Sequence, residues 1–156
     1  MDDLLNALPE AYRDIPLPPG LISLQRVQGG WSREHKYRLE MYGGALLLLR
    51  VREGGQEEVH RREYDFVRSL SSRGLPVPRP HAFGPAGGGH GSYMLLDWVS
   101  GIDLTDVLPG LPQAEQYRLG KSAGEMLRDI HRTPVPENAL PAGSMKRKAL
   151  HKTKRF

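Results

Sequence analysis

Breaks rich in glycine and proline divide this chain into short segments, and they constrain its fold more than any other feature of the sequence. The 156 residues include 18 glycines and 13 prolines, which favour turns and interrupt helices. No apolar run approaches the ~20 residues that a transmembrane helix needs. The length fits one domain, or one lobe of a larger domain. We therefore expect short strands and helices around a modest core.

The first half of the chain predicts an antiparallel meander followed by a helix. Glycine-marked connections separate three strand-like runs, which is typical of hairpins. These runs cover residues 21–27, 34–41 and 45–52. Residues 56–72 then carry apolar side chains at roughly helical spacing, and Arg73-Gly74 closes the predicted helix.

The second half predicts two more strands and then helices. The proline-rich segment 75–80 cannot be helical and is expected to be a stiff extended connector. The other expected elements are strands at 81–84 and 92–99, a short helix or turn at 103–108, a helix at 112–131, a loop at 134–143 and a further helix at 144–156. Strands followed by helices favour an α+β fold.

The chain divides into three predicted parts. Residues 1–20 form an N-terminal helix and linker, in which the helix occupies residues 1–8 and ends at Pro9. Residues 21–100 form the sheet with its packed helix. Residues 101–156 form an exit segment and part of a helical layer.

Composition excludes several classes of function. The chain has no cysteine, so it has no disulfide, thiolate nucleophile or cysteine-based zinc site. Its acidic N-terminus is unlike a secretory signal, and we expect a cytoplasmic location without membrane contact. Residues 146–155 are strongly basic. Because such runs are usually solvated helix faces and aromatic residues are not interleaved here, nucleic acid is not an expected partner.

Three features in the first half could contact a nucleotide's phosphates. A glycine hairpin around Gly30 and Ser32 would let backbone N–H groups approach phosphate oxygens. Arg50, near the end of the third predicted strand, offers a fixed cation. Glu63, on the following helix, could hold that cation in an ion pair. Each feature alone also fits an ordinary turn or surface charge.

A fourth feature is the apolar strand at residues 93–101, which runs into a glycine-ended crossing segment. Backbone groups there could bond the edge of a purine, between aliphatic side chains that sandwich its ring. The alternative for this segment is an ordinary buried strand.

Together the four features follow the layout of protein kinases, although the G-x-G-x-x-G and V-A-I-K signatures are absent. The sequence more closely resembles the aminoglycoside phosphotransferase (choline-kinase-like) family, over roughly residues 21–135. The resemblance lies in residues 30–39, 46–51, 62–64, 74–80, 93–101 and 115–131. It implies the N-lobe of a protein-kinase-like fold, with a five-stranded antiparallel sheet and one packed helix. The first helices of a truncated C-lobe would follow.

The resemblance also implies a role for individual phosphate-site residues. Gly30 and Ser32 would cover the nucleotide phosphates. Arg50 stands where the family usually has a phosphate-contacting lysine, and it keeps the charge and can bind phosphate bidentately. Glu63 would be the ion-pair partner of Arg50.

In the purine site, the Asp97 carbonyl and the Val99 N–H would bond the base, with Met94 near the entrance of the pocket. The implied cofactor is ATP or GTP, with Mg²⁺ in a complete family member. The implied acceptor is a hydroxyl of a small molecule.

The family's catalytic loop, which reads roughly His-Gly-Asp and later Asn, does not occur in these 156 residues. Neither does the metal-binding Asp that follows it. We therefore expect a truncated kinase lobe with no catalytic or metal-binding residues of its own, inactive by itself. The alternative is a non-catalytic kinase-like binding or interaction module.

Overall fold

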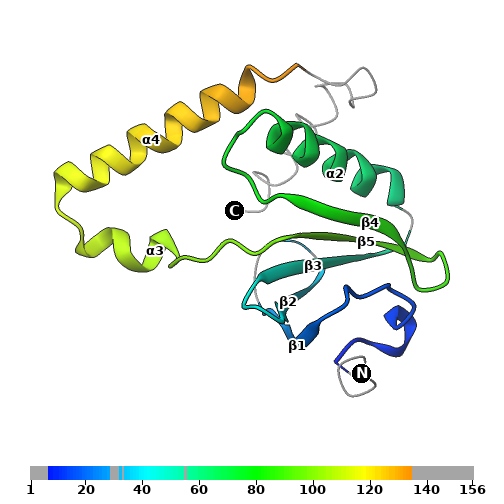
Figure 1. The fold of residues 1–156 in the computed structure, drawn as a ribbon. Helices are drawn as coiled ribbons and strands as arrows, with labels where there is room; N and C mark the ends of the chain where they lie inside the picture. The colour runs from blue at the N-terminus through cyan, green and yellow to red at the C-terminus, as the bar shows by residue number, and fades with distance from the viewer. Residues whose placement is uncertain (1–6, 29–31, 33, 55, 135–156) are drawn as a thin grey trace, which may run out of the picture.

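In the computed structural model, residues 7–28, 32, 34–54 and 56–134 are described. Their core is one five-stranded antiparallel sheet in the order β1-β2-β3-β5-β4 (Figure 1). The strands are β1 (Leu21–Arg26), β2 (His35–Met41), β3 (Leu46–Glu53), β4 (Pro80–Ala86) and β5 (Gly91–Asp97). The helices are η1 (Glu10–Tyr12), α2 (Glu57–Ser72), α3 (Leu104–Val107), η2 (Leu108–Gly110) and α4 (Gln113–His131).

Alternation along β3 gives the sheet two different faces. Leu47, Leu49 and Val51 are buried on one face. Arg50 and Arg52 alternate with them and therefore lie on the opposite face, because successive side chains of a strand point to opposite sides. The central strand thus presents apolar residues on one face, and Leu48 together with the two cations on the other.

The larger apolar cluster lies on the face covered by the N-terminal segment (Figure 1). Leu8, Tyr12 and Ile15 are buried against residues of the sheet, with only 2% of Leu8 exposed. This N-terminal segment therefore contributes buried side chains to the core of the sheet.

Helix α2 covers the opposite face through a smaller cluster. Tyr64 of the helix packs with Met94 and Leu96 of β5, and its ring centroid lies 5.4 Å from that of Phe83. The helix ends in a Schellman motif: Gly74, at φ 76°, donates to the Ser71 carbonyl, and Leu75 N–H donates to the Leu70 carbonyl. This ending follows the Arg73-Gly74 stop that the sequence predicts.

The α+β class and the five-stranded antiparallel sheet with one packed helix are confirmed, and the strand ends agree within two residues. The expected helix at residues 1–8 is not supported where it can be checked, because Ala7 and Leu8 lie in a turn and a bend. The helical turn instead follows Pro9, as a proline suits the start of a helix better than its end. The expected elements at 135–143 and 144–156 lie outside the described residues.

After β5 the chain leaves the sheet through α3, and α4 then runs back toward α2 (Figure 1). Asp103 caps α3 by accepting from the Thr105 N–H at 2.9 Å. None of the residues of α4 is buried, and Tyr117, Met126 and Leu127 are exposed apolar side chains on it. No helix in the described part of the chain is long and apolar enough to cross a membrane.

The N-terminal segment is tied to the turn between β4 and β5 by one carboxylate. Asp14 accepts from the backbone N–H of Gly87 at 2.9 Å and of Gly88 at 2.8 Å. Both glycines have positive φ angles, 64° and 62°, a conformation that glycine adopts without steric cost. The N–H groups of Gly88 and Gly87 hold the pKa of Asp14 below its ordinary value.

We expect Asp14→Ala to lower the free energy of unfolding by up to about 1 kcal/mol, because two charge-assisted hydrogen bonds are lost at a solvent-screened site. Urea unfolding at pH 7 measures this loss. Asp65→Ala, which removes an exposed α2 acid paired with Arg68, is the control and should have a smaller effect. Equal stability of wild type and Asp14→Ala would contradict the proposed tether.

Candidate functional site

Two arginines of β3 meet one buried carboxylate on the α2 side of the sheet. The Nε and Nη2 atoms of Arg50 lie 2.7 and 2.6 Å from Oε2 of Glu34. Arg52 donates to the other oxygen, Oε1, from Nε at 3.0 Å and also from Nη2. Both arginines reach the same carboxylate because they are two residues apart on one strand and so share a face.

Glu34 directly precedes β2, and its side chain is only 3% exposed. Burial by itself raises the pKa of this carboxyl, but attraction and hydrogen bonds from Arg50 and Arg52 outweigh burial and lower it. Ser32 also donates its hydroxyl to Glu34 Oε2, over a long 3.4 Å. Glu34 therefore carries a full negative charge at neutral pH.

Glu63 of α2 completes a group of four charges, the Arg-Glu cluster of Glu34, Arg50, Arg52 and Glu63. Its Oε2 atom lies 2.8 Å from Arg52 Nη2 and 3.9 Å from Arg50 Nη2. The sequence pairs Glu63 with Arg50. The structure places the two on the same side of the sheet and within ion-pair reach, but Glu63 makes its shorter contact with Arg52.

Met94 forms the apolar neighbour of this cluster. It is paired with Arg50 across β3 and β5, it is fully buried, and its sulfur accepts from Arg50 Nη1 at 3.6 Å. The guanidinium of Arg50 is thus held between a carboxylate and a thioether at a fixed place on the sheet.

The remaining predicted site residues lie at or just after the end of β5, or outside the described residues. The Asp97 carboxylate bonds His81 at 2.6 Å, and the Asp97 N–H donates to the Arg79 carbonyl at 2.9 Å. Val99 lies two residues after Asp97, the last residue of β5, and is 68% exposed. Gly30 lies outside the described residues.

His60 is a buried residue of the site that the sequence did not single out. Its Nδ1 atom lies 2.7 Å from the Ser92 hydroxyl, while its Nε2 atom has no hydrogen-bond partner among the described residues. Burial, together with the nearby Arg52 charge, lowers the pKa of His60 to about 4. His60 is therefore neutral at physiological pH.

Ligand atoms of Glu34, His60 and Glu63 lie within 4.8 Å of one another, a spacing that could hold a metal ion. Both carboxylates are already paired with guanidinium groups. A divalent cation would have to enter beside two positive charges, and Coulomb repulsion opposes this. The cluster is thus poorly suited to a divalent cation.

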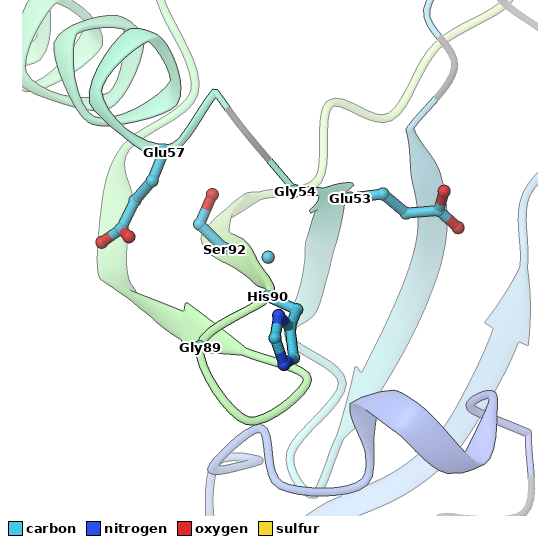
Figure 2. Close-up of a pocket in the computed structure, with 7 residues that line it drawn as sticks. Glu53, Gly54, Glu57, Gly89, His90 and Ser92 are labelled. Carbon is cyan, nitrogen blue, oxygen red and sulfur yellow. The ribbon is translucent and has the colours of Figure 1, made fainter.

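A cavity of about 280 Å³ lies elsewhere, near the start of α2 (Figure 2). Its lining residues are Glu53, Gly54, Glu57, Gly89, His90, Gly91 and Ser92. In Figure 2 the Glu53 and Glu57 side chains point away from each other. None of the residues predicted to bind nucleotide lines it.

Glu34 and Arg52 were also missed by reasoning from the sequence. Arg52 could have been found, because period-two alternation places it on the same face as Arg50. Glu34 precedes a strand by one residue and has no distinguishing local pattern. Only the pairing of β2 with β3 brings it to both arginines.

Comparison with known proteins gives one family. Residues 23–155 match the model of the phosphotransferase enzyme family (APH). The chain belongs to this family. The resemblance seen in the sequence is therefore confirmed, and the chain is a phosphotransferase-family protein with an α+β fold.

One solved structure similar to this phosphotransferase-family chain is an aminoglycoside-3'-phosphotransferase of type VIII. The identity is 30%, the match covers 65% of this chain and 34% of that chain, and the TM-score is 0.43. The chain thus spans about a third of the length of that relative. No curated protein matches it.

We expect the free energy of unfolding to fall by about 2 kcal/mol between pH 7 and pH 5. Folding lowers the pKa of His60 from 6.5 to about 4, so over this interval the unfolded chain takes up a proton that the folded chain does not. The contribution is complete above pH 6.5 and is lost as the pH falls towards 4. Urea unfolding at both pH values measures it.

The control is His60→Asn, which keeps a polar group near Ser92 but does not titrate. Its loss between pH 7 and pH 5 should be smaller than that of wild type by about 2 kcal/mol. The same loss in both proteins would contradict this account of His60.

Proposed function

We propose that this chain is the nucleotide-binding lobe of an ATP- or GTP-dependent phosphotransferase that acts on a hydroxyl group of a small molecule. The observation that carries the proposal is the position of Arg50, which projects from the central strand on the same face as Glu63. Membership of the phosphotransferase family supports the reaction class.

Arg50 would bind the α- and β-phosphates. A guanidinium offers several N–H donors in a planar fork, which fits phosphate oxygens bidentately. Its position is fixed by burial of Met94 and by the strand pairing of β3 with β2 and β5. Ser32 lies close enough to share Glu34 with Arg50, so its hydroxyl would reach the same phosphates.

The purine would lie against the segment that follows β5. We propose that the Asp97 carbonyl and the Val99 N–H bond its edge. Support comes from the exposure of Val99 and from the anchoring of its neighbour: the Trp98 N–H donates to the Leu46 carbonyl at 3.1 Å. Anchored backbone beside exposed backbone is suited to a purine edge.

Transfer itself needs groups outside this site. Phosphoryl transfer depends on an aspartate that orients the acceptor hydroxyl and on Mg²⁺ at the β- and γ-phosphates. No His-Gly-Asp occurs in the 156 residues, and the Arg-Glu cluster is neutralised internally. We propose that this polypeptide by itself holds nucleotide with its Mg²⁺ in the cytoplasm but does not transfer phosphate.

A second candidate function is a non-catalytic kinase-like binding module. The observation in its favour is the exposed apolar side chains on α4. Nucleotide binding that depends on Arg50 favours the first candidate, and nucleotide-independent association with another protein favours the second.

We expect Arg50→Ala to weaken binding of Mg-ATP or Mg-GTP by roughly ten- to a hundredfold, because charge-assisted hydrogen bonds to phosphate are lost. Isothermal titration calorimetry measures the affinity. Arg68→Ala removes the same charge from the solvent side of α2 and should bind as wild type does. Equal affinity of wild type and Arg50→Ala would refute the phosphate-binding role.

Val99→Pro should weaken nucleotide binding by roughly five- to tenfold, because proline has no N–H to offer to the purine. Inorganic tripolyphosphate lacks a base, and its affinity should not change. Val99→Ala keeps the N–H and serves as the matched control. If Val99→Pro binds nucleotide normally, the purine does not use this backbone group.

A further inference from the structure

We propose that Glu34 is an internal competitor of the nucleotide's phosphates, and that nucleotide binding displaces its carboxylate from Arg50. This inference rests on the proposed function. It adds to that function a residue, Glu34, that lowers the affinity for nucleotide. Glu34 acts by pairing with Arg50 until phosphate replaces it.

The geometry of Arg50 is the first argument. Two of its donor atoms, Nε and Nη2, converge on one oxygen of Glu34, and the Ser32 hydroxyl donates to that same oxygen. The Arg50 guanidinium and the Ser32 hydroxyl are the two groups, among the described residues, that are expected to contact phosphate. Carboxylate and phosphate oxygens accept such hydrogen bonds at similar distances. The Glu34 carboxylate therefore occupies the place of a phosphate oxygen.

Charge is the second argument. The Arg-Glu cluster holds two carboxylates and two guanidinium groups, so its charges cancel. A triphosphate carries several negative charges and gains little net attraction from a neutral cluster. Removing the charge of Glu34 leaves a net charge of +1, and at these short distances one charge changes the attraction substantially.

Arg52 makes the exchange possible. A buried carboxylate that lost its only partner would be strongly destabilised. Glu34 is also bonded to Arg52 through its second oxygen, so it keeps a partner when Arg50 turns to phosphate. Glu63 lies 3.9 Å from Arg50 and can pair with guanidinium N–H groups that do not bind phosphate. Arg52 is thus a positioning residue that holds both carboxylates during the exchange.

Competition and simple support predict opposite effects of one substitution. If Glu34 only supported the fold, its loss would lower both stability and affinity. If it competes with phosphate, its loss lowers stability, because two guanidinium groups lose a buried partner, yet raises affinity.

The experiment compares wild type, Glu34→Gln, Glu58→Gln and Arg50→Ala of the full 156-residue chain. Calorimetry with inorganic tripolyphosphate and with Mg-ATP measures affinity, and urea unfolding measures stability. We expect Glu34→Gln to bind both ligands roughly tenfold more tightly and to unfold at a lower urea concentration. Glu58 lies on the outer side of α2, and Glu58→Gln should match wild type in both measurements.

A second measurement uses wild type alone and does not depend on the variant's folding. Nitrogen-15 NMR of arginine side chains follows the Nε–H signals of Arg50 and Arg52 as tripolyphosphate is added. The Arg50 signal should shift, because its acceptor changes from Glu34 to phosphate, while the Arg52 signal moves less.

The outcomes separate this inference from the function on which it rests. If wild type and Arg50→Ala bind both ligands equally, the nucleotide site is absent and both proposals fall. If wild type binds more tightly than Arg50→Ala, but Glu34→Gln binds no more tightly than wild type, only the competitor role is overturned. An unmoved Arg50 signal at saturating tripolyphosphate would also overturn it.

Discussion

The contact between the buried Glu34 carboxylate and the two arginines of β3 is the interaction on which the site depends. It joins the start of β2 to the central strand, and through Arg52 it also reaches Glu63 on α2. One group of charges therefore ties together the sheet and its helix. An ion pair this buried is retained only with good geometry and complete hydrogen bonding, and both oxygens of Glu34 have partners.

The two faces of the sheet differ in the kind of interaction that they contribute to the fold. The N-terminal segment supplies Leu8, Tyr12 and Ile15 to the larger apolar cluster, and this apolar burial stabilises the sheet. The α2 face has a smaller apolar cluster, and it carries the charges, the buried His60 and the fixed cation Arg50. These charged groups can lie on the second face because the first face supplies most of the apolar packing.

Much of this arrangement can be predicted from the sequence, because it follows from local patterns. Alternation and glycine turns give the strands, and the Arg73-Gly74 stop gives the end of α2. The resemblance to the phosphotransferase family pointed to Arg50 and Glu63, which lie on the same face of the sheet. The difference at residues 7 and 8, the described part of the helix expected at residues 1–8, came from treating Pro9 as a helix end, although a proline also fits the beginning of a helical turn.

The sequence by itself determined the order of elements and the family, because turn residues, strand alternation and motif order are all read along the chain. Only the tertiary structure decided which acid pairs with which arginine. Glu34 lies 16 residues from Arg50 in the sequence, and Glu63 lies 11 residues from Arg52. Strand register and helix packing determine which acid meets which arginine, because they bring side chains together whatever their separation along the chain. For the same reason, the burial that keeps His60 neutral could not be predicted from the sequence.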